Sequence, residues 1–258
     1  MPTPPGFSAL KKGEPAASRA GLALVTGAGR GIGRAIAEGL VEDGWHVVAA
    51  DRDSDALDAL ARSSPGSAPL STEVMDVTDR CAVAAVLDRI GTLDLLVNNA
   101  GIAGKRCAIG TISEVEFRDV LRVNLLGIFI ASQEAVRRMG SGGAIVNIAS
   151  ASYLVSPNVP HYGMTKGAVV GLTRSMALEF RRRGISVNAV GPGAIDTTMQ
   201  SALSDEQRAH LARIYSDGPM PPAVIAAAVR YLASPEGRRA RGQMLLVDEG
   251  TSLGIDLW

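Results

Sequence analysis

The stretch "LALVTGAGRGIGRAIAEGLVEDG" (22–44) decides the fold of this chain. It begins with a short apolar run, passes through closely spaced glycines, and continues with apolar residues at helical spacing. This order predicts a buried strand, a tight turn and a helix. Gly27, Gly31 and Gly33 would let a pyrophosphate approach the backbone, while the helix start offers unpaired N–H groups. The stretch therefore predicts a dinucleotide-binding unit.

The same alternation of strand and helix continues along the chain. Six further strands are predicted at 46–51, 70–76, 93–101, 143–150, 185–193 and 243–248. Helical patterns follow near 53–62, 79–90, 113–139, 161–182 and 222–234. Strands that alternate with helices need crossover connections, which place helices on both faces of a parallel sheet. We therefore expect an α/β fold, with a doubly wound, mostly parallel, seven-stranded sheet of the Rossmann type.

Length and composition fit a single domain. The 258 residues contain no internal repeat and no long linker. Apolar residues make up 47% and aromatic residues only 4%, so the core must be aliphatic, as buried parallel sheets usually are. Residues 1–20 are rich in proline, glycine, alanine and serine, which predicts a disordered tail. We expect residues 21–258 to form one catalytic domain.

Charge and cysteine content limit the partners. Acidic and basic residues balance at 26 each, whereas a nucleic-acid partner would require a basic excess. No apolar run reaches the length of a membrane span, and the N-terminus lacks the apolar core of a signal peptide. Cys81 and Cys107 have no metal-binding spacing around them and suit a reducing compartment. We expect a cytoplasmic protein without a metal site, a nucleic-acid partner or a membrane partner.

Asp51 bears on the choice of cofactor, because it ends the second predicted strand. A carboxylate about 20 residues beyond the glycines accepts hydrogen bonds from the adenosine ribose. The same charge would repel the 2′-phosphate of NADP. Arg30, inside the glycine loop, and Arg52 argue the other way, since either could pair with that phosphate. We favour NAD as the cofactor and keep NADP as the alternative.

Tyr162 and Lys166 lie one helical turn apart in "PHYGMTKGA" (160–168). Taken alone, such a pair is usually part of a solvated helix face. A cation about 4 Å from the phenol is worth roughly 4 kcal/mol at an effective dielectric constant of 20. That energy could lower the phenol pKa, ordinarily near 10, by up to about three units. The pair therefore predicts a phenol that can exchange protons during catalysis.

Residues 21–250 resemble the short-chain dehydrogenase/reductases. The TGxxxGxG motif of that family matches residues 26–33, its NNAG motif matches 98–101, and its YxxxK motif matches 162–166. The resemblance implies the catalytic residues Asn124, Ser150, Tyr162 and Lys166. It also implies the cofactor contacts Gly27, Arg30, Gly31, Ile32, Gly33, Asp51, Arg52, Asp76, Val77, Asn98, Ala100, Gly101, Tyr162, Lys166, Pro192, Gly193, Ile195 and Thr197.

The resemblance further implies a mechanism, in which a hydride moves between a substrate carbon and the nicotinamide. Tyr162 would exchange the proton with the substrate oxygen, and Ser150 would hydrogen-bond that oxygen. Lys166 would also bind the ribose, and Asn124 would hold a water that links Lys166 to solvent. Ser152 is an alternative to Ser150, although Ser150 ends the strand directly, as the family serine does.

Two positions depart from the family pattern. Ser150 and Tyr162 are 12 residues apart, where 13 is common in the family. Glu249 stands where the family often has glycine, which puts the local turn in doubt.

The substrate is expected between segment 151–161 and a substrate-binding loop at 194–220. The candidate contacts are Ser150, Tyr153, Leu154, His161, Met199 and Tyr215. Because they are mostly apolar, we expect a secondary alcohol or ketone on a hydrophobic or cyclic skeleton. For His161 a packing role is favoured over acid–base chemistry, because it faces away from its neighbour Tyr162.

Two other functions compete with this one. An NADPH-dependent ketoreductase of 3-oxoacyl thioesters is supported by Arg30. A non-catalytic nucleotide sensor of the same fold would be expected to lose Tyr162 or Lys166, and this chain keeps both. Helix 161–182 is apolar around much of its circumference, which predicts a homodimer or homotetramer.

Overall fold

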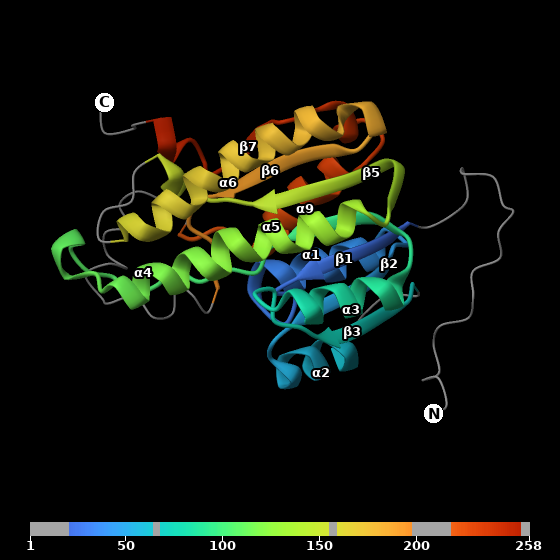
Figure 1. Cartoon of the computed structure of the whole chain (residues 1–258), viewed down its shortest axis with the longest axis horizontal. Coiled ribbons are helices and arrows are strands. Elements are labelled where there is room, and N and C mark those ends of the chain that lie inside the picture. The colour runs from blue at the N-terminus through green and yellow to red at the C-terminus, as the bar shows by residue number, and fades with distance from the viewer. Residues whose placement is uncertain (1–20, 64–67, 155–158, 198–217, 254–258) are drawn as a thin grey trace, which may run out of the picture.

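Seven strands form one sheet in the computed structural model, which describes residues 21–63, 68–154, 159–197 and 218–253 (Figure 1). The strand order is β3-β2-β1-β4-β5-β6-β7, and every neighbouring pair is parallel. The strands are β1 (Leu22–Thr26), β2 (His46–Asp51), β3 (Leu70–Val74), β4 (Leu93–Asn98), β5 (Met139–Ile148), β6 (Ser186–Pro192) and β7 (Met244–Val247). The predicted doubly wound parallel sheet is confirmed. The expected tail at 1–20 lies outside the described residues.

Helices cover both faces of the sheet. On one face pack α1 (Gly31–Glu42), α2 (Ser54–Ser63) and α9 (Pro222–Ala233). On the other pack α3 (Arg80–Ile90), α5 (Gly127–Val136) and α6 (Pro160–Glu179). α4 (Glu114–Leu121) precedes α5 and extends past the end of the sheet (Figure 1). Five short 3-10 turns lie at Ile109–Thr111, Ala151–Tyr153, Phe180–Arg183, Gly237–Arg239 and Thr251–Leu253.

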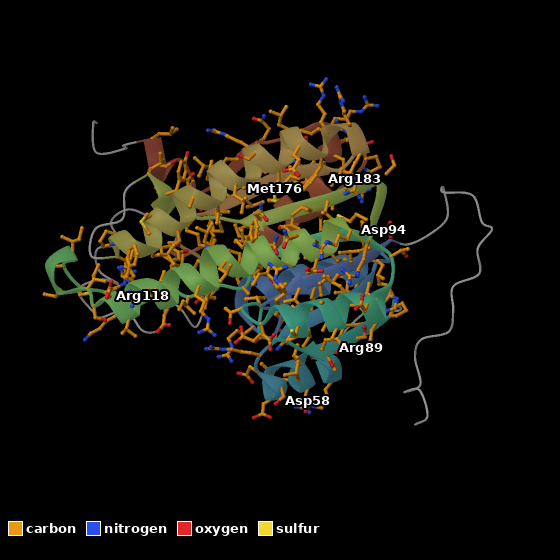
Figure 2. All side chains as sticks on the ribbon, viewed as in Figure 1. Asp58, Arg89, Asp94, Arg118, Met176 and Arg183 are labelled. Carbon is orange, nitrogen blue, oxygen red and sulfur yellow. The ribbon has the colours of Figure 1, made fainter. Side chains whose placement is uncertain are left out.

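The core is aliphatic on both faces of the sheet, as the composition predicts. In β1, Ala23 and Val25 belong to the cluster beneath α1 and α9, while Leu22 and Leu24 belong to the cluster beneath α3 and α5. This alternation follows from the two-residue period of a strand. Met176 on α6 joins the second cluster, and Figure 2 labels it between that helix and the sheet.

The sheet reverses its winding direction at β1. The chain moves outward from β1 to β2 and β3, and then returns to place β4 on the other side of β1. The connections that follow β1 and β4 therefore diverge, which opens a crevice at the carboxyl ends of the two strands. This switch point positions the site described below.

The strands predicted at 70–76 and 93–101 end earlier, at Val74 and Asn98, and two other elements differ more from the sequence prediction. The helix predicted over 113–139 is interrupted by a π-helical turn at Arg122–Leu126, which carries Asn124. β5 begins at Met139, four residues before the predicted start at 143, because Met139 pairs with Leu93 across a register shift.

Glu249 has a φ angle of +56°, the only positive φ of a non-glycine residue in the described ranges. The departure from the glycine common in the family therefore places a side chain in a left-handed conformation that glycine adopts more easily. None of the helices in those same ranges is long and apolar enough to cross a bilayer.

Candidate active site

The glycine loop packs tightly between β1 and α1. A Cβ atom at position 33 would lie 2.1 Å from the carbonyl oxygen of Gly27, so only glycine fits there. Gly31 has a φ angle of +54°, and a Cβ atom on it would stand 3.2 Å from Thr197 Cγ2. Asn99 Nδ2 donates to the carbonyl oxygens of Thr26 and Gly27, at 3.0 and 2.9 Å. The loop is thereby fixed to the end of β4, with the start of α1 open to the crevice.

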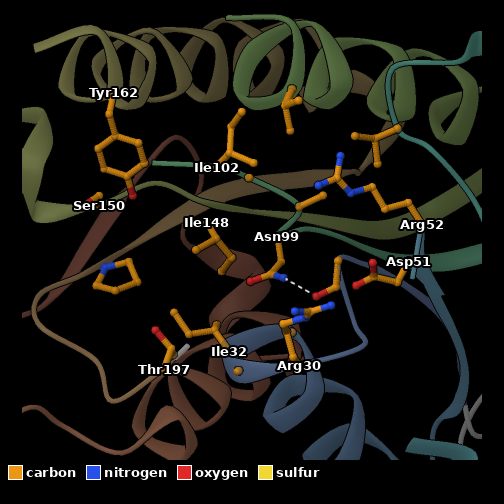
Figure 3. A pocket seen from close by; sticks show the side chains of 18 of the residues that line it. Arg30, Ile32, Asp51, Arg52, Asn99, Ile102, Ile148, Ser150, Tyr162 and Thr197 are labelled. Carbon is orange, nitrogen blue, oxygen red and sulfur yellow. Dashed lines mark hydrogen bonds between the residues drawn. The ribbon is translucent and has the colours of Figure 1, made fainter. Parts of the chain in front are cut away.

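A cavity of about 690 Å³ occupies this crevice. Figure 3 shows Asp51, Arg52 and Arg30 at one end and Ser150 and Tyr162 at the other, with Ile32 and Asn99 between them. We call these the adenosine end and the catalytic end. A long cavity with a glycine loop and a helix start at its middle suits a dinucleotide, whose pyrophosphate needs N–H donors.

Asp51 lies at the adenosine end, with its carboxylate held by the backbone. Its Oδ2 accepts the N–H of Gly29 at 2.9 Å, and its Oδ1 accepts the N–H of Asp53 at 3.1 Å. A carboxylate offers about four acceptor positions, so further donors can bind. Asp53 in turn forms an ion pair with Arg30.

Asp76 lies near two further arginines of the adenosine end, Arg52 and Arg122. Its Oδ1 accepts the N–H of Thr78 at 2.8 Å, and Arg122 donates to Thr78 Oγ1 at 3.0 Å. Burial raises the pKa of Asp76, but the hydrogen bonds from Thr78 and the charges of Arg122 and Arg52 together hold it below its usual value. Each arginine of the adenosine end thus has a carboxylate nearby.

Ser150 and Tyr162 meet at the catalytic end. Ser150 follows β5, and its Oγ accepts the N–H of Ser152 at 3.1 Å. The Ser150 hydroxyl proton therefore remains available, and Ser150 hydrogen-bonds the Tyr162 side chain. Ser150 lines the cavity, whereas the alternative serine, Ser152, is not among the lining residues.

Lys166 is buried beneath Tyr162, one turn further along α6. Its Nζ donates to the carbonyl oxygen of Ile148 at 2.8 Å and lies 5.5 Å from the centre of the Tyr162 ring. Within the described ranges no carboxylate forms an ion pair with it. Burial lowers the pKa of Lys166 to about 8.

The expectation of a lowered pKa for Tyr162 is wrong for the protein alone. Burial raises the pKa of the phenol, and the hydrogen bond with Ser150 lowers it only in part. The expected shift was for an ammonium about 4 Å from the phenol, before desolvation is counted. The structure shows that desolvation of both groups dominates.

Asn124 does not line the cavity but supports its wall. Its Oδ1 accepts the N–H of Ile102 at 2.8 Å, and its Nδ2 donates to the carbonyl oxygen of Ile102 at 2.9 Å and to Thr165 Oγ1 at 3.2 Å. The π turn thereby ties the chain after β4 to α6. A Cβ atom at position 101 would stand 3.3 Å from Asn124 Oδ1 and 3.6 Å from Lys166 Nζ, so Gly101 leaves room for both.

Most of the predicted cofactor contacts line the cavity, and Asn98 does not. Its amide nitrogen donates to Ser132 Oγ at 3.0 Å and to Asn147 Oδ1 at 2.8 Å, inside the protein. The predicted contacts that line the cavity are Gly27, Arg30, Gly31, Ile32, Gly33, Asp51, Arg52, Asp76, Val77, Ala100, Gly101, Tyr162, Lys166, Pro192, Gly193, Ile195 and Thr197.

The predicted substrate contacts lie mostly away from this cavity. Tyr153 packs against a small apolar cluster under α6, and Leu154 is exposed. His161 is buried, with its Nε2 3.8 Å from Glu116 Oε1. Met199 and Tyr215 lie outside the described residues.

The two ends of segment 194–220, the expected substrate-binding loop, belong to the described residues. Ile195 and Met220 form a parallel bridge, in which Asp196 N donates to the carbonyl oxygen of Met220 and Met220 N to that of Ala194, both at 2.9 Å. Ile195 and Thr197 line the cavity.

Several lining residues were not singled out from the sequence. Asn99 belongs to the NNAG motif, so its place beside Asn98 was a usable signal. Asp53 lies two residues after Asp51, and Arg122 two residues before Asn124, but only the fold brings these side chains to the cavity.

The comparisons with known proteins agree with this geometry. A family model described as Enoyl-(Acyl carrier protein) reductase matches residues 27–252. The 3-oxoacyl-(acyl-carrier-protein) reductase FabG of Vibrio cholerae is 40% identical over 241 residues, which cover 89% of this chain and 96% of that protein. The cis-4-hydroxycyclohexanecarboxylate dehydrogenase of Sinomonas cyclohexanicum is 38% identical over 238 residues, with 89% and 95% covered.

Solved structures show the same likeness. A short-chain dehydrogenase from Burkholderia cenocepacia, in complex with NADP, has a TM-score of 0.83 and 34% identity, over 89% of this chain and 96% of that one. The fold and site define a dinucleotide-binding oxidoreductase. The chain belongs to the short-chain dehydrogenase/reductase family, whose members use a nicotinamide cofactor.

Proposed function

We propose that this protein uses NAD, in preference to NADP, to interconvert a secondary alcohol and a ketone on a hydrophobic or cyclic skeleton. The observation that carries the cofactor choice is the position of Asp51. Two backbone N–H groups hold its carboxylate at the adenosine end of the cavity. Ribose hydroxyls could donate to its remaining lone pairs, while a 2′-phosphate there would meet a fixed negative charge.

The catalytic roles follow from the side chains of the catalytic end. When bound, the nicotinamide supplies a carbon that accepts or releases a hydride. The Ser150 hydroxyl, which hydrogen-bonds the Tyr162 side chain in the protein alone, would donate a hydrogen bond to the substrate oxygen and orient it toward the Tyr162 hydroxyl. In reduction the Tyr162 phenol gives its proton to the carbonyl oxygen, and in oxidation the deprotonated phenol takes the proton of the alcohol. Lys166, held by the Ile148 carbonyl, supplies positive charge beneath the phenol and a donor for ribose hydroxyls.

Asn124 has a supporting role in this proposal. Both N–H groups of its side-chain amide and one lone pair of its oxygen are used by Ile102 and Thr165, and these bonds hold the wall beside Lys166. A water that links Lys166 to solvent, as the family resemblance implies, would bind on this wall.

The substrate class is supported by one relative and opposed by others. The relative from Sinomonas cyclohexanicum acts, by its name, on a hydroxylated cyclohexane ring, which fits a cyclic secondary alcohol. The relatives named FabG are reductases of 3-oxoacyl groups on a carrier protein. That second function would use NADPH, and Arg30 at the adenosine end favours it. The pairing of Arg30 with Asp53 favours the first function.

The deciding experiment follows nicotinamide absorbance with NAD, NADP and their reduced forms. The substrate panel should contain cyclic secondary alcohols, their ketones and a 3-oxoacyl thioester. We expect turnover of a cyclic alcohol with NAD, and Asp51→Ala should shift selectivity toward NADP by roughly tenfold, the worth of a charge-assisted hydrogen bond. Asp55→Ala, an exposed residue of α2, is the matched control. Faster turnover of the thioester with NADPH in the unmutated protein would establish the second function instead.

We also infer a homo-oligomer in the cytoplasm, with residues 21–258 as one catalytic domain and 194–220 as the substrate loop. An open apolar groove lies across α4, α5 and α6, lined by Arg118, Leu121, Arg122, Leu125, Leu126, Phe129 and Leu172. Leu126 and Phe129 are 45% and 44% exposed, which is costly for large apolar side chains without a partner. A second copy of the chain, seated on this groove, would cover them.

Light scattering tests this assembly. Phe129→Glu should convert a dimer or tetramer into a smaller species, whereas Val74→Glu, at an exposed position on β3, should not. A wild-type monomer at micromolar concentration would contradict the proposal.

The cysteines support the proposed location in the cytoplasm. Cys81 and Cys107 are both free thiols, as a reducing compartment would keep them.

A further inference from the structure

We propose that Asp53 is a second determinant of cofactor choice, because it holds Arg30 away from the 2′-position of the adenosine ribose. This inference rests on the proposed function, since it concerns how the same cavity separates NAD from NADP. Both residues line the adenosine end.

The carboxylate of Asp53 has a different partner on each oxygen. Its Oδ1 accepts the N–H of Ala56 at 3.0 Å and so caps the start of α2. Its Oδ2 forms the ion pair with Arg30 Nη2. The Asp53 backbone N–H binds Asp51, so the two acidic residues form one connected unit. Asp53 is therefore fixed from two sides when Arg30 meets it.

Arg30 is the arginine best placed to change the outcome. It precedes α1 in extended conformation, and its side chain caps nothing. Arg52 and Arg122 lie near the charge of Asp76 but form no ion pair with it in the described residues, whereas Arg30 is paired with Asp53. A 2′-phosphate that recruits Arg30 must displace Asp53 and must also approach the charges of Asp51 and Asp53. Competition between Asp53 and the phosphate for Arg30, and repulsion of the phosphate by the carboxylates, both disfavour NADP.

Partial exposure sets the expected size of this effect. The side chains of Arg30 and Asp53 are 55% and 35% exposed, so water weakens the pair. Such pairs contribute up to about 1 kcal/mol, which corresponds to roughly fivefold in a dissociation constant. The lost repulsion between Asp53 and the phosphate adds to this factor.

Asp53→Asn is the sharpest variant, because the amide oxygen can still accept the Ala56 N–H while the charge is lost. Calorimetry should give the dissociation constants of adenosine 5′-phosphate and adenosine 2′,5′-bisphosphate. Neither ligand carries nicotinamide, so the readout is independent of turnover. We expect the bisphosphate to gain at least roughly fivefold relative to the monophosphate. Asp55→Asn, in the first turn of α2 and outside the cavity, should change neither constant.

A second background tests the role assigned to Arg30. In Arg30→Ala, adding Asp53→Asn should give much less than the gain seen in the wild type, because the freed cation is absent. An equal gain in both backgrounds would show that Asp53 acts by repulsion alone, and would overturn the inference. If Asp53→Asn fails to fold, Asp53→Ser retains a capping oxygen and replaces it.

The two proposals fail in different ways. An unchanged ratio of the two dissociation constants in Asp53→Asn overturns the role of Asp53, whatever ratio the wild type has. The wild-type ratio alone tests the preference for NAD, since tighter binding of the bisphosphate there would contradict it.

Discussion

The two ends of the cavity handle charge in opposite ways. At the adenosine end, Arg30 pairs with Asp53, while the charges of Arg52 and Arg122 lower the pKa of the nearby Asp76. At the catalytic end, Lys166 is buried against a backbone carbonyl, and the described residues offer it no carboxylate. An arginine that is paired with a carboxylate can exchange this partner for a phosphate of the ligand, and such competition can select between cofactors. An unpaired buried charge keeps its full field for the reacting group, at a cost in stability.

The largest expected effect concerns the reacting phenol. Tyr162→Phe removes one hydroxyl and leaves packing nearly unchanged, so turnover should fall by roughly 10²–10⁴-fold, the usual worth of a positioned acid–base group. The affinity for the cofactor and the temperature of thermal unfolding should stay unchanged. Steady-state kinetics with a genuine substrate make the measurement, and Tyr231→Phe on the surface of α9 is the control. Near-normal turnover would mean that the catalytic end is misassigned.

The second effect concerns Lys166, whose replacement should increase the stability of the protein while it removes activity. A pKa lowered to about 8 in the folded chain means that the charged form of Lys166 costs about 3 kcal/mol. Lys166→Met should therefore abolish turnover but raise the free energy of unfolding at neutral pH by about 2 kcal/mol, once the lost hydrogen bond is counted.

This gain should depend on pH with a definite sign. Above pH 8 the unfolded wild type retains a lysine proton that the folded form has released, so wild-type stability rises with pH. The difference in unfolding free energy between wild type and Lys166→Met should therefore become smaller from about pH 8 upward. Denaturant unfolding of the cofactor-free proteins measures it, with exposed Lys105→Met as the control. A destabilised Lys166→Met would show that the charge is compensated after all.

The third prediction concerns the titration of Tyr162. Because burial raises the pKa of this phenol, tyrosinate absorbance that is lost in Tyr162→Phe should develop only above the range of a free tyrosine. The experiment uses the cofactor-free protein. A transition below that range would restore the original expectation that Lys166 dominates.

The smallest expected effect belongs to the adenosine end. Asp76→Asn removes a carboxylate whose pKa is lowered on balance, so it should destabilise the protein, opposite in sign to Lys166→Met. Asp76 is exposed, which limits the loss to about 0.5 kcal/mol. The folded-state pKa is lowered, so this stabilisation is present above the ordinary carboxylate pKa and disappears as pH falls through the lowered value. Paired unfolding curves at neutral and acidic pH would show it, and a stabilised Asp76→Asn would contradict the contrast between the two ends.

The sequence predicts the frame of the molecule better than its electrostatics. Apolar runs and glycine spacing are local signals, so all seven strands and the glycine loop were located from them. Asn98 shows where local signals stop. It ends β4, and its side chain enters the core, while that of Asn99 clamps the glycine loop. Nothing in two adjacent asparagines distinguishes these directions before the strand end is known.

The pKa values of Tyr162 and Lys166 show even more clearly than Asn98 what local sequence signals cannot predict. Their direction depends on how much water the fold removes around Tyr162 and Lys166, and spacing along a helix carries no such information. The π turn at Asn124 and the pairing of Arg30 with Asp53 likewise arise from tertiary contacts between segments distant in the chain.

The bridge between Ile195 and Met220 has a consequence for how such enzymes diversify. The chain leaves the cavity wall and returns to it at one point, so the intervening length can change without shifting the strands. With 194–220 as the proposed substrate loop, new substrate ranges would evolve, or be engineered, by exchanging residues 198–219 as a cassette, while Ile195 and Thr197 stay in the cavity wall. The cofactor preference encoded beyond β1 and β2 would be inherited intact.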